Sequence, residues 1–118
     1  MDTPAHPRII VIGSDASLSY LIGRYAEQGG YWVANIQVVP SPAEARALQP
    51  AAILFQSVES LEASQTLIRD LAECDFPPVL VCSSVTDEAR ARELGADRCL
   101  LHPLTYDSVV SALTSADR

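Results

Sequence analysis

The stretch that decides the fold is Ile9-Ile10-Val11-Ile12-Gly13-Ser14-Asp15, a short apolar run followed at once by a turn. A continuous apolar run of this length is typical of a strand buried on both faces of a parallel sheet. Ser14 and Asp15 then offer N-cap side chains for a helix. One face of that helix carries apolar residues at helical spacing, namely Leu18, Leu21, Ile22 and Tyr25.

The same alternation of apolar run and helical stretch recurs four more times. Further strands are expected at residues 31–39, 51–55, 79–82 and 99–101. Further helices are expected at residues 42–48, 61–74 and 86–95, and from residue 105 or 107 onward. Such alternation predicts right-handed crossovers and a parallel sheet covered on both faces. We expect one α/β domain over residues 1–118, in which residues 1–7 are flexible.

Composition narrows the classes of function. The chain has a net charge of −7, and all eight of its basic residues are arginines. This balance argues against a surface that follows nucleic-acid phosphates and against docking on anionic lipid. Three cysteines, at positions 74, 82 and 99, show no disulfide or metal-ligand spacing, which favours a reducing compartment. With no expected signal peptide or membrane span, we expect a cytoplasmic protein.

In an open parallel sheet, ligands bind beyond the carboxyl ends of the strands. The residues that follow the predicted strands are therefore the first candidates for a functional site. They are Gly13, Ser14, Asp15, Gln56, Ser57, Ser83, Ser84, His102 and Pro103. Gly13-Ser14-Asp15 is not a nucleotide-binding fingerprint, and His102 has no second ligand at metal-site spacing, so we expect no cofactor and no metal.

Three segments, residues 50–56, 78–84 and 95–103, resemble response-regulator receiver domains. The most specific of them is the Gly-Ala-Asp turn at residues 95–97, which precedes a short strand that ends before Pro103. The resemblance covers essentially the whole chain. It implies a flavodoxin-like (βα)5 three-layer sandwich whose five parallel strands lie in the order 2-1-3-4-5.

The chain departs from the receiver pattern at the positions that carry the chemistry. Gly13 and Ser14 stand where the resemblance implies an acidic pair, and Gln56 stands where it implies a phospho-accepting Asp. Mg²⁺ prefers carboxylate and other hard oxygen ligands, and an amide is a poor nucleophile. Gln56 is then either a locked mimic, hydrogen-bonded to Ser83 and Ser14, or a satisfied polar residue at a decayed site. An atypical acceptor, with Asp15 as the example, stays open as an alternative.

The switch residues implied by the resemblance are also altered. Ser83 matches the switch hydroxyl, but Cys99 replaces the aromatic switch residue and His102 replaces the Lys before the last Pro. Because no lysine occurs anywhere in the chain, no other alignment with the receiver pattern would place a lysine side chain at this position. His102 carries a comparable charge only when it is protonated.

These residues lead us to expect a degenerate receiver, or pseudo-receiver. Such a domain is a signalling module of two-component (phosphorelay) type that binds a protein partner or forms a homodimer, without catalysis. A small-ligand sensor that uses the crevice at the ends of the strands is the alternative from another class. The expected interaction face surrounds the last strand and the last helix, because the helix before that strand is expected to be short. Its candidate residues are Arg98, Cys99, Leu101 and Tyr106.

Overall fold

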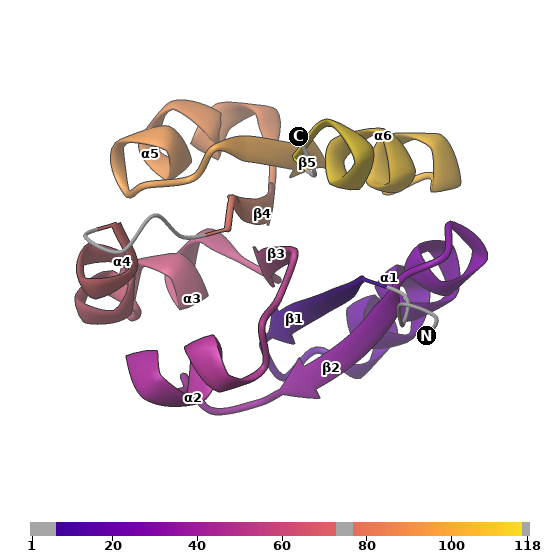
Figure 1. Cartoon of the computed structure of the whole chain (residues 1–118). Coiled ribbons are helices and arrows are strands. Elements are labelled where there is room, and N and C mark those ends of the chain that lie inside the picture. The colour runs from indigo at the N-terminus through magenta and orange to yellow at the C-terminus, as the bar shows by residue number, and fades with distance from the viewer. Residues whose placement is uncertain (1–6, 73–76, 117–118) are drawn as a thin grey trace, which may run out of the picture.

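Five parallel strands form a single sheet in the order β2-β1-β3-β4-β5 (Figure 1). The strands are β1 (Arg8–Ile12), β2 (Trp32–Ile36), β3 (Ala52–Phe55), β4 (Val79–Ser83) and β5 (Arg98–Leu101). This computed structural model describes residues 7–72 and 77–116. The predicted flavodoxin-like (βα)5 sandwich and its strand order are confirmed. The expected flexibility concerns residues 1–7, of which residues 1–6 lie outside the described part of the chain.

The helices cover the two faces of the sheet unequally (Figure 1). α1 (Ala16–Gln28) and α6 (Tyr106–Ala116) lie together on one face. The opposite face carries four shorter helices, α2 (Pro42–Ala47), α3 (Val58–Glu62), α4 (Gln65–Ala72) and α5 (Glu88–Glu93). A 3₁₀ turn, η1 (Val85–Asp87), leads into α5. None of the helices in the described residues has the length and apolarity needed to span a bilayer.

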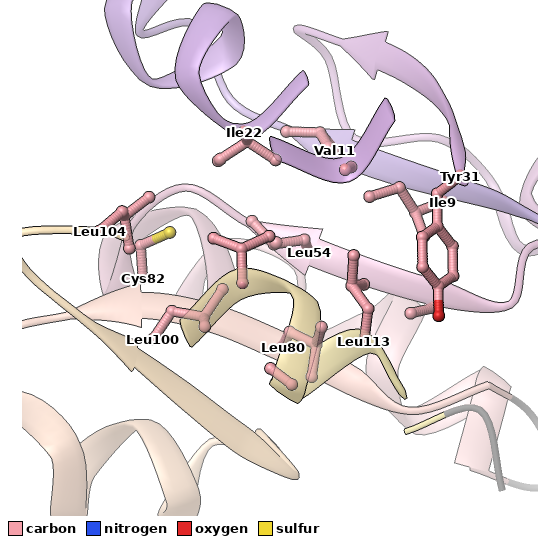
Figure 2. Packing of buried hydrophobic residues seen from close by; sticks show 14 residues of the cluster. Ile9, Val11, Ile22, Tyr31, Leu54, Leu80, Cys82, Leu100, Leu104 and Leu113 are labelled. Atoms are coloured by element: carbon pink, nitrogen blue, oxygen red, sulfur yellow. The ribbon is translucent and has the colours of Figure 1, made fainter. Parts of the chain in front are cut away.

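Alternate residues of the central strands belong to two separate hydrophobic cores, one on each face of the sheet. Ile9, Val11, Leu54 and Leu80 point toward α1 and α6, where they pack with Ile22, Val109 and Leu113 (Figure 2). Ile10, Ile53, Phe55 and Val81 point the other way and pack against the four shorter helices. Every residue of β3 and β4 is buried, and all of them are apolar except Ser83 at the end of β4, so both faces of these strands are apolar rather than one.

Local capping explains where several helices begin. The Asp15 carboxylate accepts a hydrogen bond from the Leu18 N–H at 3.0 Å and so acts as the N-cap of α1. Ser41 and Glu44 form a reciprocal capping box at α2, with Pro42 in its first turn. The Thr105 hydroxyl oxygen accepts from the Ser108 N–H at 3.1 Å, immediately before α6 begins.

The second strand is shorter than predicted. Residues 31–39 were expected to be extended, but β2 ends at Ile36. The Ile36 carbonyl accepts from the Gly13 N–H at 3.0 Å, and β1 provides no partner beyond that point, because the chain turns into α1. Val38 and Val39 therefore leave the sheet and lie exposed.

The helix predicted over residues 61–74 is wrong in its start and in its continuity. Ser57 caps the chain by accepting from the Ser60 N–H, so α3 begins at Val58. The Ser64 hydroxyl donates to the Ser60 carbonyl at 2.7 Å, which competes with helical pairing, and α4 begins afterwards. Cys74 lies outside the described residues.

The helix expected over residues 86–95 is short, as predicted. It consists of η1 followed by the six residues of α5. The sequence favours Thr86 or Asp87 as its N-cap, but Thr86 pairs with the Ser84 hydroxyl at 2.9 Å and Asp87 makes no capping bond through its side chain. The first turn is accordingly 3₁₀ rather than α.

The turn at residues 95–97 fixes the start of β5. The Asp97 carboxylate accepts from the Val79 N–H at 2.8 Å, and the Asp97 N–H donates to the Val79 carbonyl at 2.7 Å. This exchange aligns the beginning of β5 with the beginning of β4. The acidic residue of the Gly-Ala-Asp turn thus has a structural role at the amino end of the sheet.

Candidate functional site at the carboxyl ends of the strands

The residues that follow the strands meet at one end of the sheet. The Gln56 N–H donates to the Ile12 carbonyl at 3.0 Å, which places the end of β3 beside the end of β1. The His102 N–H donates to the Ser83 carbonyl at 3.3 Å, which does the same for β5 and β4. Cys99 lies further back, because it pairs with Val81 in the middle of the β4–β5 ladder.

Gln56 is buried, with 4% of its surface exposed, and its amide is fully engaged. The side-chain oxygen Oε1 accepts from the Asp15 N–H at 2.8 Å. The Nε2 group donates to the Ser19 hydroxyl at 2.6 Å and to the Asp15 carbonyl at 3.3 Å. Both partners lie at the start of α1, so this side chain ties the end of β3 to the N-terminus of α1.

These partners correct one of the two interpretations of Gln56, the locked mimic. It named Ser83 and Ser14 as hydrogen-bond partners, whereas the observed ones are the Asp15 backbone and Ser19. The hydrogen bonds of the Gln56 amide are directed toward the β1–α1 side of the site, away from β4. Ser19 was missed, although its position one helical turn after the N-cap Asp15 places its hydroxyl in the first turns of α1.

Gly13 makes room for the Gln56 side chain. Its φ of +150° is a conformation that L side chains rarely adopt. A Cβ atom at Gly13 would lie 2.3 Å from Gln56 Oε1 and 2.8 Å from Gln56 Cβ. The Gln56 side chain can therefore take its observed position only because Gly13 has no Cβ atom.

The donor set does not suit the Mg²⁺ ion that a receiver fold implies. Gly13 supplies no side chain, and Ser14 supplies an exposed hydroxyl rather than a carboxylate. Asp15 is the one acid among the described residues that directly follow the strands, and its carboxylate accepts a hydrogen bond from the Leu18 N–H as the N-cap of α1. Residues 7–72 and 77–116 contain no group of three or more His, Cys, Asp or Glu side chains placed to hold a metal ion. Mg²⁺ needs hard oxygen ligands, chiefly carboxylates, and this site does not assemble them.

Ser83 is the counterpart of Gln56 at the end of β4. It is equally buried, with 4% of its surface exposed. None of the described residues offers its Oγ atom a hydrogen-bond partner. A buried hydroxyl without a partner is uncommon because it loses its hydrogen bonds to water without replacement.

His102 and Cys99 lie apart from this pair. The His102 side chain is exposed, and the peptide bond between His102 and Pro103 is cis. The Cys99 thiol lies 3.9 Å from the Glu88 carbonyl oxygen. The neighbouring Cys82 points into the core shared with α1 and α6, where burial raises the pKa of its thiol to about 12.

A surface groove runs along β5 between α5 and α6. Its volume is about 370 Å³, and it is lined by Arg92, Arg98, Cys99, Leu100, Leu101, Ser108, Ser111 and Ala112. Three of the four residues expected on an interaction face, Arg98, Cys99 and Leu101, therefore lie together in it. Both charged residues in its lining, Arg92 and Arg98, are basic, although Arg92 is ion-paired with Glu88 at 3.2 Å and the chain as a whole is acidic.

Tyr106 is the exception, and its expected place on this groove is wrong. Its ring packs edge-to-face against Tyr25 of α1, with 6.1 Å between the ring centroids. Two residues of an α-helix span about 200° of rotation. Because Ser108 faces the groove, Tyr106 faces away from it, toward α1.

No protein-family model and no curated protein sequence matches this chain. Solved structures do match. The Vibrio cholerae chemotaxis protein CheY4 superposes with a TM-score of 0.75 at 16% identity, over 95% of this chain and 99% of that chain. A response regulator from Thermotoga maritima gives 0.74 at 19% identity, over 95% and 98% of the two chains.

The BeF3-activated N-terminal receiver domain of Klebsiella pneumoniae RstA is a third example. It gives a TM-score of 0.68 at 19% identity, over 94% of this chain and 98% of that chain. At such identities the likeness concerns the fold. The chain has the flavodoxin-like fold of CheY-like receiver domains over nearly its whole length.

Proposed function

We propose that this domain is a receiver-like signalling module that works without aspartyl phosphorylation, as a pseudo-receiver. The observation that carries the proposal is the amide of Gln56, which follows β3 and is held by three hydrogen bonds to Asp15 and Ser19. In a receiver fold, the residue at this place attacks the phosphodonor. An amide is a poor nucleophile and cannot form an acyl phosphate as a carboxylate does.

The surroundings of Gln56 support the same conclusion. The acid-poor turn at Gly13 and Ser14 does not suit Mg²⁺, and the chain has no lysine to neutralise a phosphoryl group. Asp15 is the alternative phosphate acceptor, but its carboxylate already accepts a hydrogen bond from the Leu18 N–H as the N-cap of α1. Phosphorylating that carboxylate would remove a cap from a thirteen-residue helix.

We further propose that the domain acts through protein–protein contacts on the groove along β5. Arg92 and Arg98 line this groove, and a partner segment with acidic side chains would complement them. The partner is either another protein or a second copy of this chain. We propose no catalysis, no cofactor and no nucleic-acid binding for this domain. A cytoplasmic location is part of the proposal and is supported by the free thiols of Cys82 and Cys99.

One observation favours a second candidate function, the sensing of a small ligand. The hydroxyl of Ser83 is buried and lacks a partner among the described residues. A ligand with an acceptor oxygen could satisfy it. Such a ligand would raise the melting temperature of the wild-type domain, and it would not raise that of Ser83→Ala.

The test of the leading proposal uses beryllofluoride, which mimics a phosphoryl group on a carboxylate. Amide NMR spectra of the domain should be unchanged by beryllofluoride with Mg²⁺, while an ordinary receiver treated in parallel shifts. Arg98→Glu should abolish partner capture or dimerisation, and Arg24→Glu, an exposed arginine on α1, should leave it intact. Saturable shifts around Gln56 on adding beryllofluoride would refute the pseudo-receiver proposal.

A further inference from the structure

The opposite edge of the sheet carries a second surface, which the proposed function does not use. β2 is the outermost strand, at the margin of the sheet away from β5 (Figure 1). Its five residues, Trp32–Ile36, include no charged residue and no proline. Soluble proteins usually protect an edge strand with such residues, and β5 begins with Arg98.

Backbone groups of β2 face this open edge. The Trp32 N–H donates to the Pro7 carbonyl and the Ile36 carbonyl accepts from Gly13, so these residues direct their backbone groups toward β1. Backbone groups alternate in direction along a strand. The N–H and C=O groups of Val33 and Asn35 therefore point outward, where the described residues supply no neighbouring strand.

An apolar groove lies beside the carboxyl end of β2. Its volume is about 520 Å³, and Ile36, Val38, Val39, Pro40, Ala47 and Leu48 form its apolar lining. Val38 is the most exposed large hydrophobic side chain in the described part of the chain, with 77% of its surface accessible. We call this surface, with the open edge of Trp32–Ile36, the β2–α2 groove.

Charge distinguishes between the possible occupants of the β2–α2 groove. Glu44 is the one charged residue in its lining, and the whole chain has a net charge of −7. A second copy docked edge to edge would bring two acidic chains together, with a Glu44 on each side. A segment with basic side chains would instead meet a favourable field.

We propose that the β2–α2 groove binds an extended segment of a partner protein, in which apolar residues alternate with basic ones. The segment adds to the sheet as a strand beside β2, where the outward groups of Val33 and Asn35 pair with its backbone. Its apolar side chains enter the groove beside Val38 and Leu48, and a basic side chain approaches Glu44. This surface is separate from the groove along β5.

The probe is a blocked seven-residue peptide that alternates valine and lysine, with a valine–glutamate peptide of the same length as its counterpart. The readouts are the fluorescence of Trp32, which is the only tryptophan in the chain, and amide NMR shifts. We expect saturable binding of the lysine peptide, with the largest shifts at Val33, Asn35 and Val38. The glutamate peptide should bind at least about tenfold more weakly.

Two pairs of variants make the test specific. Val38→Ser should weaken binding about tenfold, because burial of one valine side chain is lost. Val85→Ser, at a valine that is 70% exposed in η1, should leave binding unchanged. Glu44→Gln keeps a residue type that serves in the capping box and should weaken binding several-fold, whereas Glu59→Gln on α3 should not.

Three results would overturn the proposal. The first is an absence of binding by the lysine peptide at millimolar concentration. The second is binding that Val38→Ser does not weaken, or shifts centred on β5. The third is a dimer in sedimentation experiments without peptide that Val38→Ser dissociates, because a second copy would then be the occupant.

Discussion

Gln56, at the end of β3, and Ser83, at the end of β4, are buried to the same extent, but of these two side chains only that of Gln56 has hydrogen-bond partners among the described residues. The Gln56 amide uses both of its polar atoms, on Asp15 and Ser19. The Ser83 hydroxyl has no partner among the described residues. The two side chains therefore have different surroundings although their burial is the same.

The Gln56 side chain joins two elements that are far apart in sequence, the end of β3 and the start of α1. The Ser83 side chain makes no such connection within the described residues. We therefore expect substitutions at the two residues to have opposite consequences for stability.

The largest effect is expected at Gly13, which limits the space for Gln56. Gly13→Ala would place a Cβ atom 2.3 Å from Gln56 Oε1, at a φ of +150°. Overpacking and backbone strain together should cost about 3 kcal/mol of unfolding free energy. Urea denaturation measures this cost. In a Gln56→Ala background the same change should cost less, about 2 kcal/mol, since the clash with Oε1 is gone while the Cβ of residue 56 still lies 2.8 Å from the added Cβ.

A second, smaller loss is expected for Gln56→Ala. The change leaves the Asp15 N–H and the Ser19 hydroxyl without their partner and opens a cavity, so we expect about 2 kcal/mol of destabilisation. Gln37→Ala, at an exposed glutamine after β2, should change stability by less than about 0.5 kcal/mol. Equal effects of these two changes would show that the Gln56 hydrogen bonds contribute nothing.

Ser83→Ala should behave differently from Gln56→Ala. Removal of a buried hydroxyl that has no partner should leave stability unchanged or raise it by up to about 1 kcal/mol. Ser64 provides the matched control, because its hydroxyl is also buried but donates to the Ser60 carbonyl at 2.7 Å. Ser64→Ala should cost about 1 kcal/mol. A loss at Ser83 as large as that at Ser64 would mean that Ser83 has a partner.

Burial of the Cys82 thiol predicts that the stability of the domain depends on pH. Burial raises the pKa of Cys82 to about 12 from a reference value of 9.0, so folding favours the protonated form. The unfolded chain releases this proton first, and stability should therefore fall as pH rises from about 9 to about 12. Cys82→Ala should flatten that part of the profile. At pH 8, iodoacetamide should modify the partly exposed Cys99 at least about tenfold faster than Cys82.

Local signals in the sequence predicted the alternation of strands and helices and the parallel sheet, whereas the strand order followed from the resemblance to receiver domains. Buried strands such as Ile9–Ile12 are apolar throughout, and a glycine or proline marks several of the turns, as at Gly13 and Gly95. The wrong predictions occur where hydrogen bonds to another segment or to a side chain, rather than local propensity, decide whether a residue belongs to a strand or helix. Val38 and Val39 have strand propensity, but β1 has already turned away and offers them no partner. Likewise, no periodicity reveals that Ser64 would interrupt a helix.

The site was predictable in position but not in its contacts. The order of the strands places Gln56 beside the turn at Gly13, whereas the partners of its amide, Asp15 and Ser19, depend on a side-chain conformation that the sequence does not specify. Tyr106 was assigned to the wrong side of α6. In that case the helical phase relative to Val109, which is buried against the sheet, would have indicated its direction.

The most direct measurement of whether this domain has lost aspartyl phosphorylation is its intact mass after incubation with acetyl phosphate and Mg²⁺. A receiver domain with a complete acidic site, treated in parallel, shows that the donor is active. Gln56→Asp tests whether a carboxylate alone is enough, and we expect no phosphoryl adduct because Gly13 and Ser14 supply no acids and the chain has no lysine. For the wild-type domain we predict an unchanged mass, and a stoichiometric phosphoryl adduct would contradict the pseudo-receiver proposal.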